Sequence, residues 1–105
     1  MLVGPGPASK RALGAARMTI SDIDLIEVNE AFAAQYLGCE IELGLNREIT
    51  NVNGSGIGLG HPVGATGARI MVTLLHALKR RQKSLGMATL CGGGGVSMAC
   101  VLEML

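Results

Sequence analysis

The sequence contains very few aromatic residues and carries almost no net charge. Of its 105 residues, one is Tyr, one is Phe and none is Trp, and the formal net charge is +1. Nucleic-acid-binding surfaces need a basic field for the phosphates and often aromatic side chains for base stacking. We therefore expect no nucleic-acid partner. The three cysteines, Cys39, Cys91 and Cys100, form neither a paired disulfide framework nor a Cys-x-x-Cys site, so we expect reduced thiols and no bound metal.

Long apolar runs are also missing. No segment approaches the roughly 18 consecutive apolar residues of a membrane-spanning helix, and residues 1–6 lack the charged and apolar regions of a secretory signal. We expect a cytoplasmic protein with no membrane partner. Apolar residues nevertheless make up 49% of the chain, which is enough for a core, so residues 1–105 are expected to form a single domain.

The order of the predicted elements indicates an α/β fold in which a mixed sheet packs with helices. Apolar periodicity predicts helices over residues 8–17, broken at Gly14, over 30–43, and after Gly64. Strands are predicted over 23–28, 49–53, 85–90 and 96–104, and the last two are expected to form an antiparallel hairpin.

Two helices are predicted to bury apolar stripes. The stripe of the second helix comprises Ala31, Ala34, Leu37, Gly38 and Ile41, and that of the last helix comprises Met71, Leu74, Leu75 and Leu78. We expect Cys39 and Cys100 to be small buried core residues and His76 to lie on the helix surface. The basic residues between 79 and 83 are expected to be a solvated helix end.

Most of the 16 glycines lie in two clusters, each beside a chemically reactive residue. The first, within residues 54–67, contains His61, and the second, residues 92–95, follows Cys91. Neither cluster contains a GxGxxG or GK[ST] motif, which argues against a dinucleotide or nucleotide site. The first cluster instead delivers His61 to a helix start, where free N–H groups favour an oxyanion. A lone His beside Gly and Pro is equally explained as a turn residue.

Four blocks of sequence resemble one known family in their order and spacing. They are Asn29-Glu30-Ala31-Phe32-Ala33, Asn53-Gly54, Gly60-His61-Pro62-Val63-Gly64-Ala65-Thr66-Gly67-Ala68-Arg69 and Cys91-Gly92-Gly93-Gly94. Together they closely resemble the C-terminal signatures of thiolases, the acetyl-CoA acetyltransferases. The resemblance runs from about residue 4 to residue 105 and implies the C-terminal half of the layered αβαβα thiolase fold.

The resemblance also implies roles for individual residues. His61 would deprotonate a nucleophilic Cys and help to bind the thioester oxygen. Cys91 would be the acid/base that moves a proton at the substrate α-carbon. Asn29 would fix a water in one oxyanion hole, and the N–H of Gly93 would belong to a second. The chemistry agrees, because carbon–carbon bond formation beside a thioester creates an enolate and a tetrahedral oxyanion.

The substrate implied is a coenzyme A thioester, with no metal and no resident cofactor. Gly60 and Gly92, next to His61 and Cys91, are expected to line the substrate site. Gly92 departs from the family, which often has a larger residue there.

A larger departure is the length of the chain, because thiolases are several times longer and carry their acyl-accepting Cys in an N-terminal half that nothing here resembles. One hypothesis is therefore a carboxyl half of an acyltransferase that acts with a separate thiolase N-terminal half, or in a homo-oligomer. An alternative is a catalytically inactive truncated domain that acts only through association. A second alternative is a protein similar to β-ketoacyl synthases, although these usually place a His where Cys91 stands.

Overall fold

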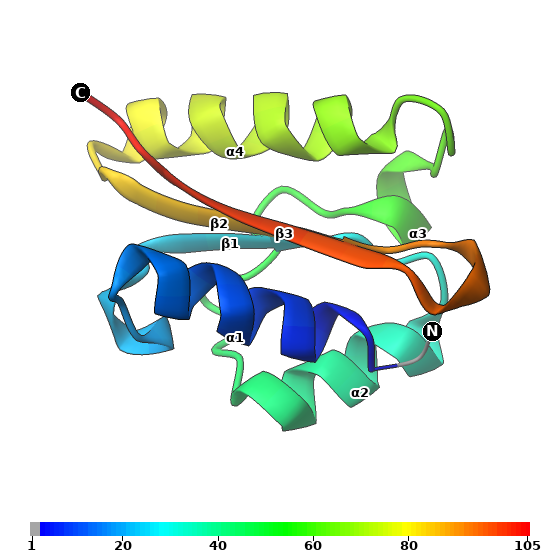
Figure 1. The fold of residues 1–105 in the computed structure, drawn as a ribbon. Helices are drawn as coiled ribbons and strands as arrows, with labels where there is room; N and C mark the ends of the chain where they lie inside the picture. Colours follow the sequence, from blue (N-terminus) through cyan, green and yellow to red (C-terminus); the bar gives the residue numbers. More distant parts are fainter. Residues whose placement is uncertain (1–2) are drawn as a thin grey trace.

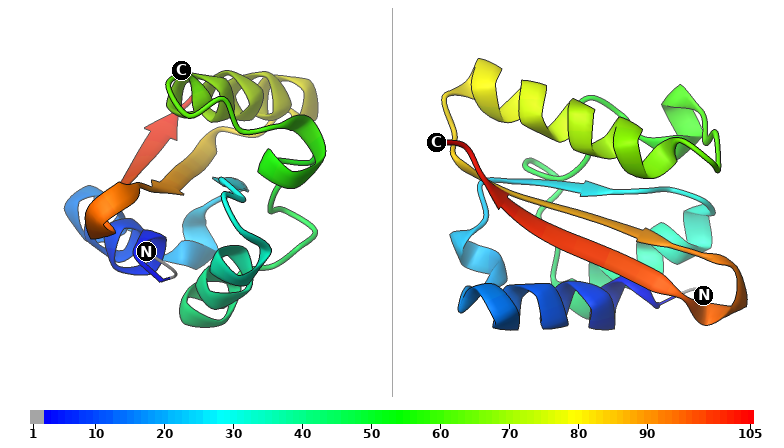
Figure 2. Two further views of the ribbon diagram at one scale, coloured as in Figure 1. Left: turned by 90° about the vertical axis from the view of Figure 1, so that its right-hand side faces the viewer. Right: turned by 45° about the horizontal axis from the view of Figure 1, so that its top comes forward.

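The computed structural model describes residues 3–105, so residues 1–2 of the expected domain lie outside the described residues. The helices and strands follow one another as α1 (Pro5–Ala16), β1 (Leu25–Val28), α2 (Ala33–Leu43), α3 (Gly56–Leu59), α4 (Thr66–Arg81), β2 (Leu85–Cys91) and β3 (Ser97–Glu103), with 3-10 turns at Ile20–Asp22 and Gly93–Gly95. The helix α4 covers one face of the sheet, and α1 and α2 cover the other (Figures 1 and 2). The predicted mixed α/β fold is confirmed.

The sheet has the order β1-β2-β3. The pair β1–β2 is parallel, with Val28 opposite Thr89, and the pair β2–β3 is antiparallel, with Cys91 opposite Ser97. This confirms the expected C-terminal hairpin. Because parallel strands end at the same edge of a sheet, the segments that follow β1 and β2 start close together.

Two apolar clusters form the core, one on each face of the sheet. The cluster beneath α4 contains Leu25, Ile70, Leu74, Ala77, Leu78 and Ala88, and the cluster beneath α1 and α2 contains Leu13, Ile23, Ile26, Val28, Cys39, Leu43, Leu45 and Met87. Gly86 lets α4 approach the sheet, because a Cβ atom there would lie 2.9 Å from Leu78 Cδ1. The expected burial of Cys39 is confirmed, whereas Cys100 is only half-buried, with Sγ 3.2 Å from Met71 Sδ.

The first two helices differ from their predicted bounds. The helix α1 begins at Pro5, whose fixed φ suits a first turn, and continues through Gly14, where nothing crowds the backbone. The helix α2 begins only at Ala33, because Gln35 Oε1 accepts a hydrogen bond from the Ala31 N–H and holds that segment outside the helix. It ends as predicted at Gly44, with φ +64°.

The predicted buried stripe of α2 was wrong. The buried positions are Gln35, Cys39 and Leu43, while Leu37 and Ile41 are 47% and 84% exposed. Gln35 can be buried because both ends of its carboxamide are bonded, to the Ala31 N–H and to Cys39 Sγ. The α2 helix therefore turns an apolar face outward.

The predicted strand over residues 49–53 is absent. Only two isolated bridges occur there, Ile26–Thr50 and Val52–Gly54, because Asn51 has φ +51° and breaks the extended run. The strand predicted over 23–28 is shortened to 25–28 by the preceding 3-10 turn, and the glycine-rich segment 54–64 contains the short helix α3.

The α4 helix largely matches its prediction. Leu74 and Leu78 are buried and Met71 is half-buried, but Leu75 is 37% exposed and lies at the edge of the stripe. His76 and the basic last turn are exposed, as expected. Within residues 3–105, the helices are all too short or too polar to traverse a membrane.

Candidate active site

The predicted site residues gather around the carboxyl edge of β1 and β2. Asn29 directly follows β1, and its N–H donates to the Thr89 carbonyl oxygen at 3.0 Å, two residues before Cys91. The loop after β1, the helix α3, the start of α4 and the turn between β2 and β3 all lie at this end of the molecule, on the right in Figure 1. The topology therefore brings both glycine clusters to one edge, although they are about 30 residues apart in sequence.

His61 is held by the first turn of α4. Thr66 Oγ1 donates to the Pro62 carbonyl oxygen at 3.0 Å and lies 2.7 Å from His61 Nδ1. A hydroxyl has one proton, so once it is given to Pro62 the Thr66 oxygen accepts from Nδ1–H. A neutral imidazole protonated on Nδ1 has its free lone pair on Nε2. His61 can therefore act as a base through Nε2, and its place is set by more than a simple turn.

Asn29 lies against His61. Its Nδ2 is 3.4 Å from His61 Nδ1, the longer of the two contacts that this ring nitrogen makes. With the proton on Nδ1 both nitrogens are donors, so this is a packing contact rather than a hydrogen bond. Gly56 makes room for the amide, because a Cβ atom there would lie 3.0 Å from Asn29 Oδ1 and 2.8 Å from the Glu30 carbonyl oxygen. The structure thus brings together two of the predicted site residues, Asn29 and His61, in direct contact.

Asn51 is a residue that the sequence analysis missed. Its Oδ1 accepts from the Val28 N–H at 2.8 Å and its Nδ2 donates to the Val28 carbonyl oxygen at 2.9 Å. One side chain therefore replaces a neighbouring strand at the last residue of β1 and fixes the backbone that leads into Asn29. The sequence contained one indication, which is that Asn51 stands close to Asn53-Gly54. Asn tolerates a positive φ better than most residues, so an Asn at this place could have suggested a turn rather than a strand.

Cys91 is buried at the end of β2, and its side chain lies on the opposite face of the sheet from His61. Alternation along the strand puts it on the same face as Thr89, whose hydroxyl lies 3.5 Å from the Pro5 carbonyl oxygen of α1. His61, by contrast, contacts the start of α4, on the other face of the sheet. Within residues 3–105, no hydrogen bond joins Cys91 to His61 or Asn29, so its predicted role stays a prediction.

The second glycine cluster forms an open turn. The Gly92 N–H donates to the Val96 carbonyl oxygen at 2.6 Å and is therefore not free for a substrate. Gly93 begins the 3-10 turn, in which the first N–H groups have no partner within the turn itself. No atom lies within 4 Å of a Cβ built on Gly93. Gly60, in the other loop, has φ +97°, a conformation that favours glycine.

Two charged residues behind the site were also missed. Glu27 on β1 is 2% exposed, and burial raises its pKa to about 7, although the nearby charge of Arg69 acts in the opposite direction. All three guanidinium nitrogens of Arg69 are buried without a hydrogen-bond partner among the described residues. The sequence offered one indication for each residue. Glu27 is a charged residue inside an otherwise apolar predicted strand, and Arg69 is a charged residue in the first turn of a predicted helix.

Comparison with known proteins decides the family. Residues 1–104 match the family described as "Thiolase, C-terminal domain". The chain belongs to the thiolase family. It is 58% identical over 105 residues to the acetyl-CoA acetyltransferase of Escherichia coli, covering 100% of this chain and 27% of that protein. It is 54% identical over 103 residues to the 3-ketoacyl-CoA thiolase of Cronobacter sakazakii, covering 95% of this chain and 27% of that thiolase.

Solved thiolases have the same fold over this region. The crystal structure of the Bacillus anthracis acetyl-CoA acetyltransferase matches with a TM-score of 0.97 and 56% identity, over 99% of this chain and 26% of that chain. The Syntrophomonas wolfei enzyme matches with a TM-score of 0.93 and 47% identity, over 97% of this chain and 27% of that chain. The chain thus spans about a quarter of the length of the thiolases it matches.

Proposed function

We propose that this chain is part of a thiolase that acts on coenzyme A thioesters, catalysing thiolysis or Claisen condensation between acetyl-CoA and a 3-ketoacyl-CoA. In this proposal, His61 takes the proton of an acyl-accepting Cys that belongs to the rest of the enzyme. Cys91 exchanges a proton with the substrate α-carbon. Asn29 and the Gly93 N–H stabilise negative charge on the thioester oxygens.

The observation that carries this proposal is the arrangement of His61. Because Nδ1 donates to Thr66, the lone pair on Nε2 is available to a thiol, and the hydrogen bond fixes the ring orientation. Asn29, in contact with the same ring, adds an amide beside the place where a thioester oxygen would lie. A solitary turn histidine would need neither partner.

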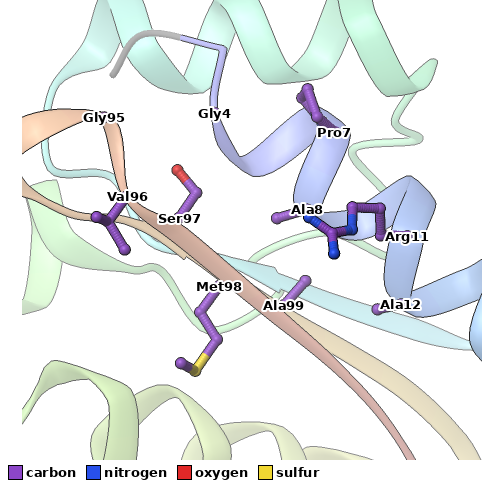
Figure 3. A pocket seen from close by; sticks show the side chains of 10 residues that line it. All are labelled: Gly4, Pro7, Ala8, Arg11, Ala12, Gly95, Val96, Ser97, Met98 and Ala99. Atoms are coloured by element: carbon purple, nitrogen blue, oxygen red, sulfur yellow. The ribbon is translucent and has the colours of Figure 1, made fainter.

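The remaining part of the enzyme has a surface on which to dock. The strand β3 is at the sheet edge, and residues of β3 and α1 together line a hollow of about 720 Å³. Figure 3 shows Ala99 pointing toward Ala12 of α1 and Met98 pointing toward α4. Val96, just before this strand, and Met98 on it are exposed apolar side chains. Unpaired strand edges and clustered apolar side chains are typical of surfaces that another chain or domain covers.

A chimera tests the proposal. Residues 1–105 would replace the matching segment of the Escherichia coli acetyl-CoA acetyltransferase, and thiolysis of acetoacetyl-CoA would be followed by the formation of acetyl-CoA. We expect an active chimera. Replacing His61 with Ala should lower kcat about 10²–10⁴-fold, the usual contribution of a general base.

The matched control is His76→Ala, because His76 is exposed on α4 and makes no contact with the site. We expect this variant to retain full activity. A folded chimera that shows no thiolysis, or that tolerates His61→Ala, would contradict the proposal. Adding the isolated chain to the N-terminal portion of the Escherichia coli enzyme would test whether the two parts also assemble without a covalent link.

The main alternative is a non-catalytic domain that acts only through association. The outward apolar face of α2, with Leu37 and Ile41, favours it, because such a face is available for a partner. The same chimera separates the two candidates, since association without catalysis predicts a folded and inactive protein.

A further inference from the structure

A pair of buried charges lies directly beneath Asn29 and His61. Glu27 stands two residues before Asn29, inside the strand β1, and is almost fully buried. Arg69 stands three residues after Thr66 in α4, and its guanidinium nitrogens are buried without a hydrogen-bond partner among residues 3–105. An arginine remains protonated, and a buried charge without a counter-charge is unfavourable. The Arg69 guanidinium therefore needs an acceptor.

The spacing on the two elements identifies this acceptor. Residues i and i+2 share one face of a strand, and residues i and i+3 are neighbours on one face of a helix. Asn29 and Glu27 thus share a face of β1, and Thr66 and Arg69 share a face of α4. Since Asn29 and Thr66 both contact the His61 ring, this spacing places Glu27 and Arg69 on the facing sides of β1 and α4, and the Arg69 charge is close enough to act on the Glu27 carboxyl.

The surroundings of Glu27 contain one further polar partner and one further charge. Ser55 Oγ, just before α3, lies 3.5 Å from Glu27 Oε2 and 3.3 Å from the Val28 carbonyl oxygen. The Arg69 charge and the Ser55 hydroxyl favour the ionised carboxylate, while burial and the Glu30 charge oppose it. The cluster therefore connects β1, α3 and α4, the three elements that carry or flank Asn29 and His61.

We propose that Glu27 and Arg69 form a buried charge pair that fixes α4 against β1 and so holds His61 in contact with Asn29. Among the described residues no ion pair within 4.0 Å joins the two side chains, so the Arg69 charge acts on the Glu27 carboxyl through space. Both are positioning residues, because neither reaches the open edge where a substrate would lie. The catalytic consequence rests on the proposed function, whereas the pair itself does not.

The first experiment measures catalysis in the chimera described above. Glu27→Gln keeps the shape of the side chain but removes its charge, and we expect kcat at pH 8 to fall about 10-fold with KM within about twofold, because a misplaced base slows the chemical step more than binding. Arg69→Met should have a similar effect. The double variant should be no worse than either single variant, since both remove the same interaction.

The matched control is Glu48→Gln, which removes the charge of an exposed glutamate in a connecting loop and should leave kcat unchanged. An unchanged kcat in Glu27→Gln, or strictly additive losses in the double variant, would overturn the proposal.

The second experiment measures the pair without catalysis. The pKa of Glu27 would be determined by carbon-13 NMR titration of its carboxyl group in the 105-residue chain, in the parent and in the Arg69→Met and Arg69→Lys variants. Loss of the positive charge should raise the Glu27 pKa, whereas Lys should largely preserve it. The same pKa in all three proteins would refute the pair. An inactive parent chimera would count against the proposed function alone, and this titration would then decide the inference.

Discussion

Two places in the glycine loops at the carboxyl edge of the sheet use glycine for opposite reasons. In the first loop, Gly56 has neighbours so close that a Cβ atom would lie 2.8 Å from the Glu30 carbonyl oxygen. In the second loop, no atom lies within 4 Å of a Cβ placed on Gly93, Gly94 or Gly95, and the last two have positive φ values of +70° and +83°. Glycine permits close packing at Gly56, and it permits the turn conformation and open access at Gly93, Gly94 and Gly95.

This difference indicates how the site is constructed. Around the first loop, side chains do the positioning, through the contacts of Thr66, Asn29 and Asn51. Around the second loop, the predicted donor is a backbone N–H, that of Gly93, and no side chain crowds that position. Changes at Gly56 should therefore affect stability and activity together, while changes at Gly93 should separate them.

The largest expected effect comes from removing the Gly93 donor. Gly93→Pro deletes the N–H, and the extended conformation of Gly92, with φ −130° and ψ 168°, is compatible with a following proline. In the chimera we expect kcat to fall about 10²–10³-fold, as for the loss of one oxyanion-hole donor. Unfolding by urea should change by less than about 1 kcal/mol.

Gly93→Ala retains the N–H and serves as its control, with kcat expected within a few-fold of the parent. Equal losses in the proline and alanine variants would mean that the second loop, like the first, is limited by packing rather than by its backbone donor.

A smaller effect is expected from crowding the first loop. Gly56→Ala should lower the free energy of unfolding by about 1–3 kcal/mol, because the new methyl group meets backbone that cannot easily move. Activity should fall with it, since Asn29 Oδ1 is the next atom displaced.

Gly58→Ala is the matched comparison in the same short helix, where nothing lies within 4 Å of the added Cβ. We expect this variant to be neutral or stabilised by up to about 1 kcal/mol, because Ala favours helix over Gly. Urea titrations of both variants measure the difference, and equal stabilities would show that the close approach at Gly56 does not matter.

The smallest expected effect is a pH dependence confined to the first region. The folded pKa of Glu27, about 7, lies above the ordinary value of 4.5 for a glutamate, so the folded state binds more protons than the unfolded state between these values. Its contribution to stability is fully present below pH 4.5 and is lost as the pH rises toward 7. We expect a loss of at most about 2.5 kcal/mol between pH 5 and pH 8.

The Glu27→Gln variant should not show this loss of stability between pH 5 and pH 8. The unfolding free energy of the variant minus that of the parent should therefore increase as the pH rises. Urea titrations at pH 5, 6, 7 and 8 check the sign. A difference between variant and parent that is constant with pH would contradict the raised pKa. A positioning carboxylate that reduces stability at working pH fits the general trade-off between stability and activity.

Much of the site could be predicted from the sequence because its motifs act locally. The glycine at position 44 ends α2, the helix after Gly64 places His61 at its start, and residues 85–103 form the hairpin that carries Cys91. These features depend on backbone conformations that nearby residues set. Asn51 and Arg69 escaped prediction because their importance depends on partners 23 or more residues away, such as Val28, and no local pattern reveals those partners.

The sequence by itself determined the thiolase motifs, the two glycine loops, the last helix and the C-terminal hairpin, because short-range sterics and periodicity decide such features. Only the tertiary structure decided that α2 buries Gln35 rather than Leu37, and that residues 49–53 form no strand. It also decided that Thr66 accepts a hydrogen bond from Nδ1 of His61, which leaves Nε2 without a proton. Each of these depends on which distant groups satisfy a buried polar atom. That matching is a property of the packed chain, because a buried donor or acceptor is stable only where the fold supplies its partner.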